Sequence, residues 1–228
     1  GMIRELCRNV ERIHYPVKFH NLKDVSRMFS DLQNKLKFIP VLNDFDMLEY
    51  SKNFNEGNFI KVGIFKNPMD LKIQKFHNLL HNHEKMKYTL ELPQMCEVFY
   101  KHAGVEYSTR WDKFFVDFSL NSPVTDYNGE KVFVHDDRSR NLTVKEQFFS
   151  EKTVYRPKHT LGSKKNNTIF DYIDILESVD EIHCMDSSFA CFIDHCESLK
   201  DKKKYIHRYL RANNLNPHYR NNWEYFLG

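Results

Sequence analysis

Apolar residues recur along the first 65 residues with two different spacings, and these spacings predict alternating helices and strands. Apolar residues at helical spacing predict helices at residues 3–10 and 22–32, and a weaker pattern predicts a third helix at 44–50. Short apolar runs give three predicted strands, at residues 12–19, 36–42 and 59–65. This order of elements favours a parallel sheet with crossover helices.

The pattern resumes after residue 90 with the same two kinds of element. Strands are predicted at residues 131–135, 153–157, 181–185 and 203–211, with a weaker signal at 142–148. Helices are predicted at residues 93–103, 168–179 (with Thr168 as cap) and 187–196. The tail 213–227 is rich in aromatic residues, too apolar for a free end, so we expect it to pack back on the body.

A stretch rich in His, Lys and Asn, residues 67–87, separates the two patterns and reads as surface helix and loop. We place a domain boundary near residues 85–92, which divides the chain into an N-terminal unit, 1–90, and a C-terminal unit, 91–228. The predicted fold class is α/β with two Rossmann-like parallel-sheet halves. Because the first pattern begins on a helix, the N-terminal half is expected to lack its opening strand.

Composition narrows the classes of protein that this chain can represent. The 228 residues are 41% hydrophobic and 14% aromatic, which is enough to build a sizeable core, and the net charge of +3 does not predict a nucleic-acid partner. No apolar run reaches the ~18 residues of a membrane span. Five cysteines without a CxxC pair predict free thiols in a reducing compartment, hence a cytoplasmic protein. The motifs of serine hydrolases, zinc proteases and P-loop kinases do not occur.

Polar residues cluster where two predicted strands end. In the stretch EIHCMDSSFACF, Asp186, Ser187 and Ser188 occupy the turn between a strand and a helix. Ligands of open α/β sheets bind outside the carboxyl ends of strands, and the free N–H groups of a helix start bind phosphate oxygens. These three residues are therefore candidate phosphate ligands. The alternative is that Asp186 or Ser187 only caps its own helix.

The second cluster, VFVHDDRSR, follows the predicted strand 131–135. His135, Asp136 and Asp137 are candidates for acid–base catalysis, and they lie next to basic side chains that could bind phosphate, namely Arg138, Arg140 and the more distant Arg156. A structural ion cluster is the main alternative. A divalent metal is a third, although adjacent aspartates point in different directions and no further ligand spacing is visible.

Three segments in this order resemble a group of glycosyltransferases of the GT-B fold that is frequent in marine microbial and viral sequences. They are FYKHAGVEYSTRWDKFFV (99–116), KVFVHDDRSR (131–140) and TIFDYIDILESVDEIHCMDSSFACFIDH (168–195). The group looks distantly similar to the C-terminal halves of fucosyltransferases and heptosyltransferases. The chain departs from the fucosyltransferase pattern at the first site, where carboxylates rather than a basic pair follow the His.

The resemblance implies transfer of a sugar from a nucleotide-diphosphate donor to a glycan or other hydroxyl acceptor, without metal or other cofactor. It places His135, Asp136, Asp137 and Arg138 facing the donor, and residues 186–188 at its phosphates. The incomplete N-terminal half would expose a sheet edge that could drive homodimerisation.

Two other functions stay open at this point. One is a catalytically silent α/β binding or assembly module that kept the crevice. The other is a phosphotransferase or phosphatase that uses Asp136 as nucleophile, which would need a bound Mg²⁺ beside that strand end.

Overall fold

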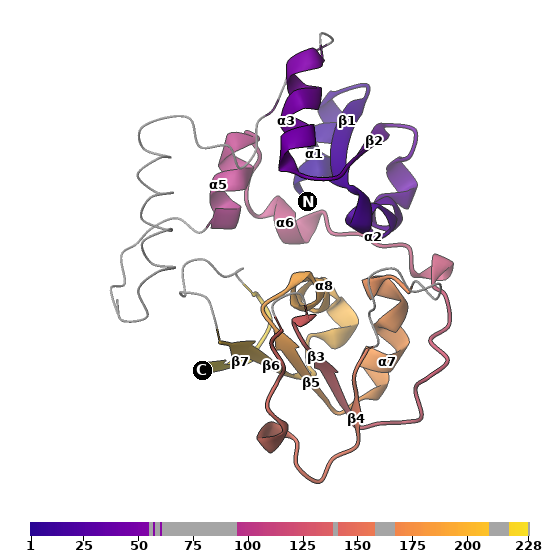
Figure 1. Ribbon diagram of the computed structural model, residues 1–228, viewed down its shortest axis with the longest axis vertical. Helices are drawn as coiled ribbons and strands as arrows, with labels where there is room; N and C mark the ends of the chain where they lie inside the picture. Colours follow the sequence, from indigo (N-terminus) through magenta and orange to yellow (C-terminus); the bar gives the residue numbers. More distant parts are fainter. Residues whose placement is uncertain are drawn as a thin grey trace.

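The computed structural model describes residues 1–54, 57, 60, 95–138, 141–157, 167–209 and 219–227. It is an α/β structure with two parallel sheets, one of two strands in the N-terminal part and one of five strands in the C-terminal part (Figure 1). The predicted α/β class with parallel sheets is therefore confirmed. The predicted strand at 59–65 and the predicted domain boundary at 85–92 lie outside the described residues, so the division into 1–90 and 91–228 stays a prediction.

The N-terminal part is a β-α-β unit flanked by two further helices. Its elements are α1 (Met2–Asn9), β1 (Ile13–Lys18), the short helix η1 (Phe19–Asn21), α2 (Leu22–Met28), η2 (Ser30–Leu32), β2 (Leu36–Val41) and α3 (Asp44–Asn53). β1 and β2 pair in parallel from Ile13–Leu36 to Lys18–Val41. Asn43 starts α3, since its side chain accepts hydrogen bonds from the backbone N–H groups of Phe45 and Asp46 at 2.8 and 3.1 Å.

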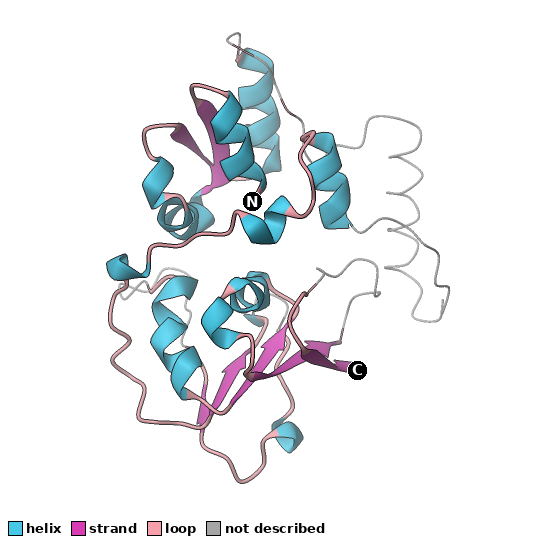
Figure 2. Cartoon of the chain, turned by 180° about the vertical axis from the view of Figure 1, so that it is seen from behind, coloured by secondary structure: helices cyan, strands magenta, loops and turns pink. Residues whose placement is uncertain are grey.

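Two helices join the parts: α5 (Met95–His102) and α6 (Thr109–Asp112), followed by η3 (Phe118–Leu120). Viewed from behind, α6 lies between the two sheets, and α5 lies beside the N-terminal part (Figure 2). Arg27 of α2 donates to the Asp117 carbonyl and the Asn121 side chain, both at 2.8 Å. On the other side, the Arg110 guanidinium donates to the Cys191 sulfur at 3.4 Å. The linking segment is thus bonded to both parts of the chain.

The C-terminal sheet consists of β3 (Val132–His135), β4 (Val154–Tyr155), β5 (Glu181–Met185), β6 (Lys203–Arg208) and β7 (Trp223–Leu227). All pairs are parallel, and the spatial order is β4-β3-β5-β6-β7. Helices η6 (Ile169–Tyr172) and α7 (Ile173–Ser178) precede β5, and α8 (Ser188–His195) and η7 (Glu197–Leu199) precede β6. Thr168 starts η6 through a reciprocal capping box with Asp171, as its position predicts.

Two predictions for this part have opposite outcomes. The strand predicted at 142–148 is wrong, because this segment forms only an isolated bridge between Asp137 and Leu142 and the short helix η5 (Glu146–Phe148). The predicted packing of the tail is confirmed, because it adds β7 to the sheet and buries Trp223.

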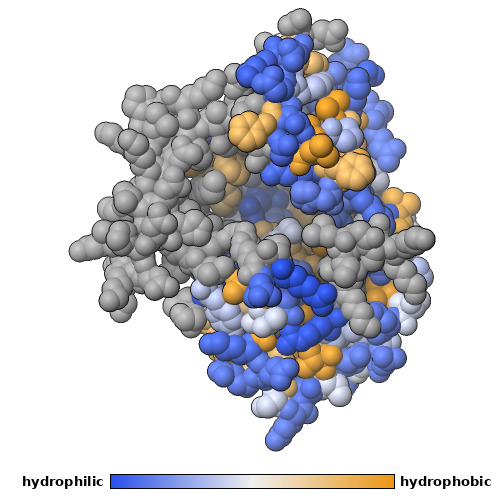
Figure 3. All heavy atoms as spheres, in the orientation of Figure 1, coloured by the Kyte–Doolittle hydropathy of each residue, from blue (hydrophilic) through white to orange (hydrophobic). Residues whose placement is uncertain are grey.

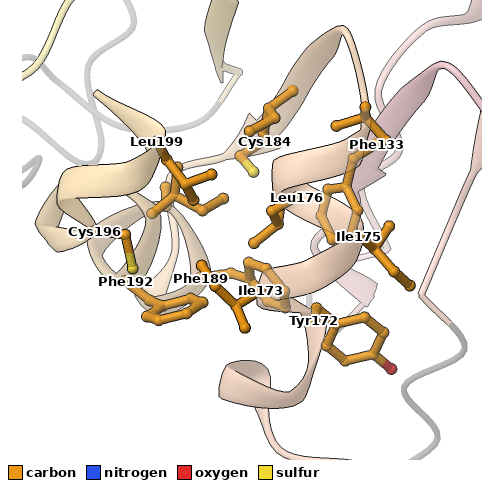
Figure 4. Close-up of a cluster of buried hydrophobic side chains, with 14 of the residues drawn as sticks. Phe133, Tyr172, Ile173, Ile175, Leu176, Cys184, Phe189, Phe192, Cys196 and Leu199 are labelled. Carbon is orange, nitrogen blue, oxygen red and sulfur yellow. The ribbon is translucent and has the colours of Figure 1, made fainter. Parts of the chain in front are cut away.

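The two faces of the five-stranded sheet are covered differently. Phe133, Ile182, Cys184 and Ile206 point to the face on which α7 and α8 pack, and they form the main core with residues such as Leu176, Phe189, Phe192 and Leu199 (Figure 4). The opposite face carries Val132, Val134 and Met185, which pack against Val144 and Phe149 from the segment between β3 and β4. This difference decides which polar residues at the strand ends can meet.

Candidate functional site at the carboxyl edge of the larger sheet

The strand order creates a switch point between β3 and β5. The chain leaves β3 for β4 on one side and then crosses back to β5 on the other side. This is the 2-1-3-4-5 order of doubly wound sheets, in which ligands bind outside the carboxyl ends of the two strands where the order reverses. The polar clusters predicted from the sequence follow these two strands.

His135 and Ser187 meet at this switch point. The His135 Nδ1 and Ser187 Oγ atoms are 3.4 Å apart, and the His135 ring stacks on Phe189 with centroids 4.6 Å apart. Ser187 is the N-cap of α8, since its Oγ accepts a hydrogen bond from the Ala190 N–H at 3.4 Å. Ser188, the first residue of α8, is exposed. The structure therefore brings His135, Ser187 and Ser188 together, and Ser187 also has the capping role considered as an alternative.

Asp186 lies beside them but is held by two partners. Its Oδ2 accepts a hydrogen bond from Arg208 Nε at 3.0 Å, and its Oδ1 accepts one from the Tyr219 hydroxyl at 2.9 Å. Burial, together with nearby charge that includes Asp186, raises the pKa of Tyr219, so the hydroxyl stays a donor. The sequence reasoning missed Arg208 and Tyr219. Arg208 lies within the strand predicted at 203–211, and the observed strand β6 ends at it just as β3 ends at His135.

Asp136 and Arg156 pair on the other side of the sheet. Arg156 Nη1 lies 2.6 and 2.5 Å from the two Asp136 oxygens. Both residues also bond to the backbone of Val144: its N–H donates to Asp136 at 2.9 Å and its carbonyl accepts from Arg156 at 3.2 Å. The pair thus anchors the segment between β3 and β4. The sequence left open an ion cluster of the aspartates with the arginines that directly follow them; in the structure Asp136 pairs with the more distant Arg156 instead.

Asp137 and Arg138 follow β3 and Asp136 directly. Asp137 forms a two-bond backbone bridge with Leu142, at 3.0 and 2.9 Å, and the Arg138 side chain is exposed. Arg140 lies outside the described residues. Within the part of the chain that the structure describes, no three His, Cys, Asp or Glu residues group so that they could hold a metal ion.

A depression of about 820 Å³ lies at the opposite, amino edge of the sheet, lined by residues such as Lys131, Lys152, Glu181 and Lys203. Its charges are mixed, and Lys152 Nζ lies 2.6 Å from a Glu181 oxygen. Since parallel sheets bind ligands at the carboxyl edge, we do not take this depression as the functional site.

Comparison of the chain with known protein families, with curated proteins and with solved structures gives no match. None of the helices among the described residues has the length and apolarity needed to cross a membrane. The basis for a function is therefore the switch point itself: a histidine, a helix start with an exposed serine, and an ordered Asp–Arg pair on one edge.

Proposed function

We propose that the chain is a glycosyltransferase of the GT-B type, which transfers a sugar from a nucleoside-diphosphate donor to a hydroxyl acceptor. The observation that carries the proposal is the meeting of His135 and Ser187 at the start of α8, across the switch point. The first N–H groups of a helix have no partner within the helix, and together with the helix dipole they favour a diphosphate at this end.

The position of the N-terminal part supports the GT-B type, in which the acceptor lies between two halves. Helix α2 follows β1 after the three residues of η1 and reaches the C-terminal part, where Asp24 accepts a hydrogen bond from the Ile169 N–H at 3.3 Å. Met28 of the same helix packs against the main core. In the space-filling view the surface is hollowed between the two parts, and hydrophilic residues form the floor (Figure 3).

Within this proposal, His135 is the group that accepts the proton of the acceptor hydroxyl. Asp136 is less suited to this role than the sequence predicts, because the Arg156 guanidinium neutralises it on the other face of the sheet. Ser188 and the first N–H groups of α8 would hold the diphosphate of the donor. Arg138 and Asp137 follow β3 and would line the same edge.

A catalytically silent binding module is the second candidate, and one observation favours it. Asp136 and Asp186, the two carboxylates that directly follow β3 and β5, are both engaged in ion pairs with arginines. A site that lacked any free base would still bind a nucleotide without transferring a sugar. Nucleotide binding without donor turnover would identify this function.

The proposal is tested by placing a negative charge at the start of α8. We expect Ser188→Asp to weaken nucleoside-diphosphate binding at least tenfold by repulsion, while an acidic residue in the first helical turn leaves folding intact. The matched control is Ser198→Asp, the same change at an exposed serine in η7, at the other end of α8.

Binding is measured by thermal shift and calorimetry with UDP, GDP, ADP and CDP, followed by donor turnover. A ligand at a hundred times its Kd stabilises a protein by about 2.7 kcal/mol, so one of the four should raise Tm clearly. If none stabilises the wild-type chain, the proposed function is wrong. If Ser188→Asp and Ser198→Asp bind alike, the diphosphate does not lie at α8.

A further inference from the structure

Arg208, at the carboxyl end of β6, is held in a fixed orientation by two residues. Its Nε donates to Asp186 Oδ2 at 3.0 Å, and its guanidinium carbon lies 4.3 Å from the centre of the Tyr225 ring. The side chain is 12% exposed, so it lies against the sheet edge rather than in solvent. An arginine ordered in this way loses little further freedom when it binds a ligand.

Asp186 is itself fixed, which makes the orientation of Arg208 reproducible. One oxygen of the carboxylate binds Arg208 and the other accepts from the Tyr219 hydroxyl at 2.9 Å. A guanidinium has one N–H on Nε and four on the two terminal nitrogens. Among the described residues, the hydrogen bonds of Arg208 involve Nε alone, so the four terminal N–H groups are available to a ligand.

The sheet places Arg208 next to Asp186, the residue before the N-cap of α8. β5 and β6 pair with Met185 opposite His207, so the next residues, Asp186 and Arg208, lie side by side. Asp186 directly precedes Ser187, the N-cap of α8, and His135 contacts Ser187 from the β3 side. Arg208 and His135 therefore flank the helix start from opposite sides.

We propose that Arg208 binds the diphosphate of the nucleotide donor through its terminal nitrogens, with Asp186 and Tyr219 as positioning residues. The inference rests on the proposed function, and it names the cation that stabilises the leaving diphosphate. The planar fork of an arginine matches two phosphate oxygens at once. Arg156 is less suited, because its terminal nitrogens already bind Asp136 and the Val144 carbonyl.

The test compares Arg208→Gln and Arg208→Lys with the wild-type chain in titrations with UDP, GDP, ADP and CDP and with the matching nucleosides. We expect Arg208→Gln to weaken nucleoside-diphosphate binding about tenfold to a hundredfold, the range for loss of hydrogen bonds to a charged group, and to leave nucleoside binding unchanged. Arg208→Lys keeps a positive partner for Asp186 but lacks the fork, so it should weaken diphosphate binding as well.

Arg220→Gln is the control, because Arg220 also lies by an aspartate and an aromatic ring, 3.7 Å from Asp112 and 5.0 Å from the Trp111 centroid, but on a different segment. It should bind both ligand types like the wild type. Melting curves of each variant show whether the fold is retained. If Arg208→Gln does not fold, the binding data of Arg208→Lys test the inference.

Two results would overturn the inference. Diphosphate affinity that is unchanged in both Arg208 variants would remove Arg208 from the site while the proposed function stood. Equal loss of nucleoside and diphosphate binding would show a structural role instead. A wild-type chain that binds none of the four nucleotides would refute the proposed function, and the inference with it.

Discussion

Two buried histidines on neighbouring strands make the stability of this chain depend on pH. His183 Nδ1 and His207 Nε2 are 3.0 Å apart, and His207 Nδ1 is 2.9 Å from the Tyr209 hydroxyl. The two residues are only 2% and 1% exposed. Glu181 lies 3.8 Å from His183 Nε2 but is itself bound to Lys152. Protonation would place a positive charge on a buried ring without a free anionic partner, which is energetically costly, and two such charges 3.0 Å apart would also repel each other.

Burial lowers the pKa of His183 to about 4, and burial with the neighbouring His183 lowers the pKa of His207 to about 3. In the unfolded chain both titrate near ~6.5. The folded state therefore holds both rings neutral, and below pH ~6.5 the unfolded state binds more protons. The stability due to the pair is complete above pH ~6.5 and is lost as the pH falls toward 4. One pKa unit corresponds to about 1.4 kcal/mol, so each ring costs about 2 kcal/mol at pH 5.

The assay is urea unfolding at pH 8, 7, 6 and 5, followed by tryptophan fluorescence. For the wild type we expect the pair to lower the free energy of unfolding by about 4 kcal/mol between pH 8 and 5. The double variant His183→Asn, His207→Gln keeps polar groups in place but cannot titrate. Its free energy of unfolding should therefore lose most of this dependence on pH between 8 and 5. His20→Asn changes an exposed histidine and should retain the wild-type slope. A double variant with the full wild-type slope would refute the reasoning.

Three further substitutions test other parts of the structure by the same unfolding assay. Asp194→Asn should cost about 2 to 3 kcal/mol, because the buried carboxylate accepts from the backbone N–H groups of Arg220 and Asn221 and from Trp223 Nε1 at 2.9 to 3.0 Å; a cost under about 0.5 would contradict its role in holding β7. Leu176→Ala, at a fully buried position, should cost about 2 to 5 kcal/mol, against almost nothing for the half-exposed Leu120→Ala. Arg156→Met leaves the Asp136 carboxylate without its cationic partner, so we expect a loss of about 3 kcal/mol, the low end for a broken buried pair because the Arg156 side chain is 27% exposed. Nucleotide affinity should be unchanged, and a stable variant with impaired binding would return Arg156 to the site.

The elements around β5 and α8 could be predicted closely because every local signal agrees. The apolar run from Glu181 to Met185 ends in a turn with two serines, and an apolar face continues to His195. The strand was predicted with its observed bounds, and Ser187 caps the helix as its residue type suggests. The signals for strand, turn and cap predict the same structure, and the tertiary packing agrees with these local preferences.

Strand β7 and the segment 142–148 show what local sequence leaves undetermined. Leu142–Phe148 has the apolar residues of a strand, but it finds only one bridge partner, since β3 is already paired with β4 and β5. Trp223–Leu227 reads simply as an aromatic tail, and it becomes a strand because β6 leaves an edge open to it. A strand is defined by its partner, and the local sequence of neither segment shows whether a neighbouring strand is free to pair with it.

The structure brings only some of the predicted site residues together, and the period of the strand explains which ones. Successive side chains of a strand point to opposite faces, so His135 joins Phe133 on the helix-covered face, whereas Asp136 joins Val134 on the other face. The polar cluster at 135–137 is therefore divided between the two faces of the sheet and does not form a single site. The same rule places Asp186 and Arg208 on the side of His135, because they continue the rows of Cys184 and Ile206. A shift of the pairing by one residue would exchange the two sets. The alternation that determines the core thus also determines which charged residues lie on the same face as His135.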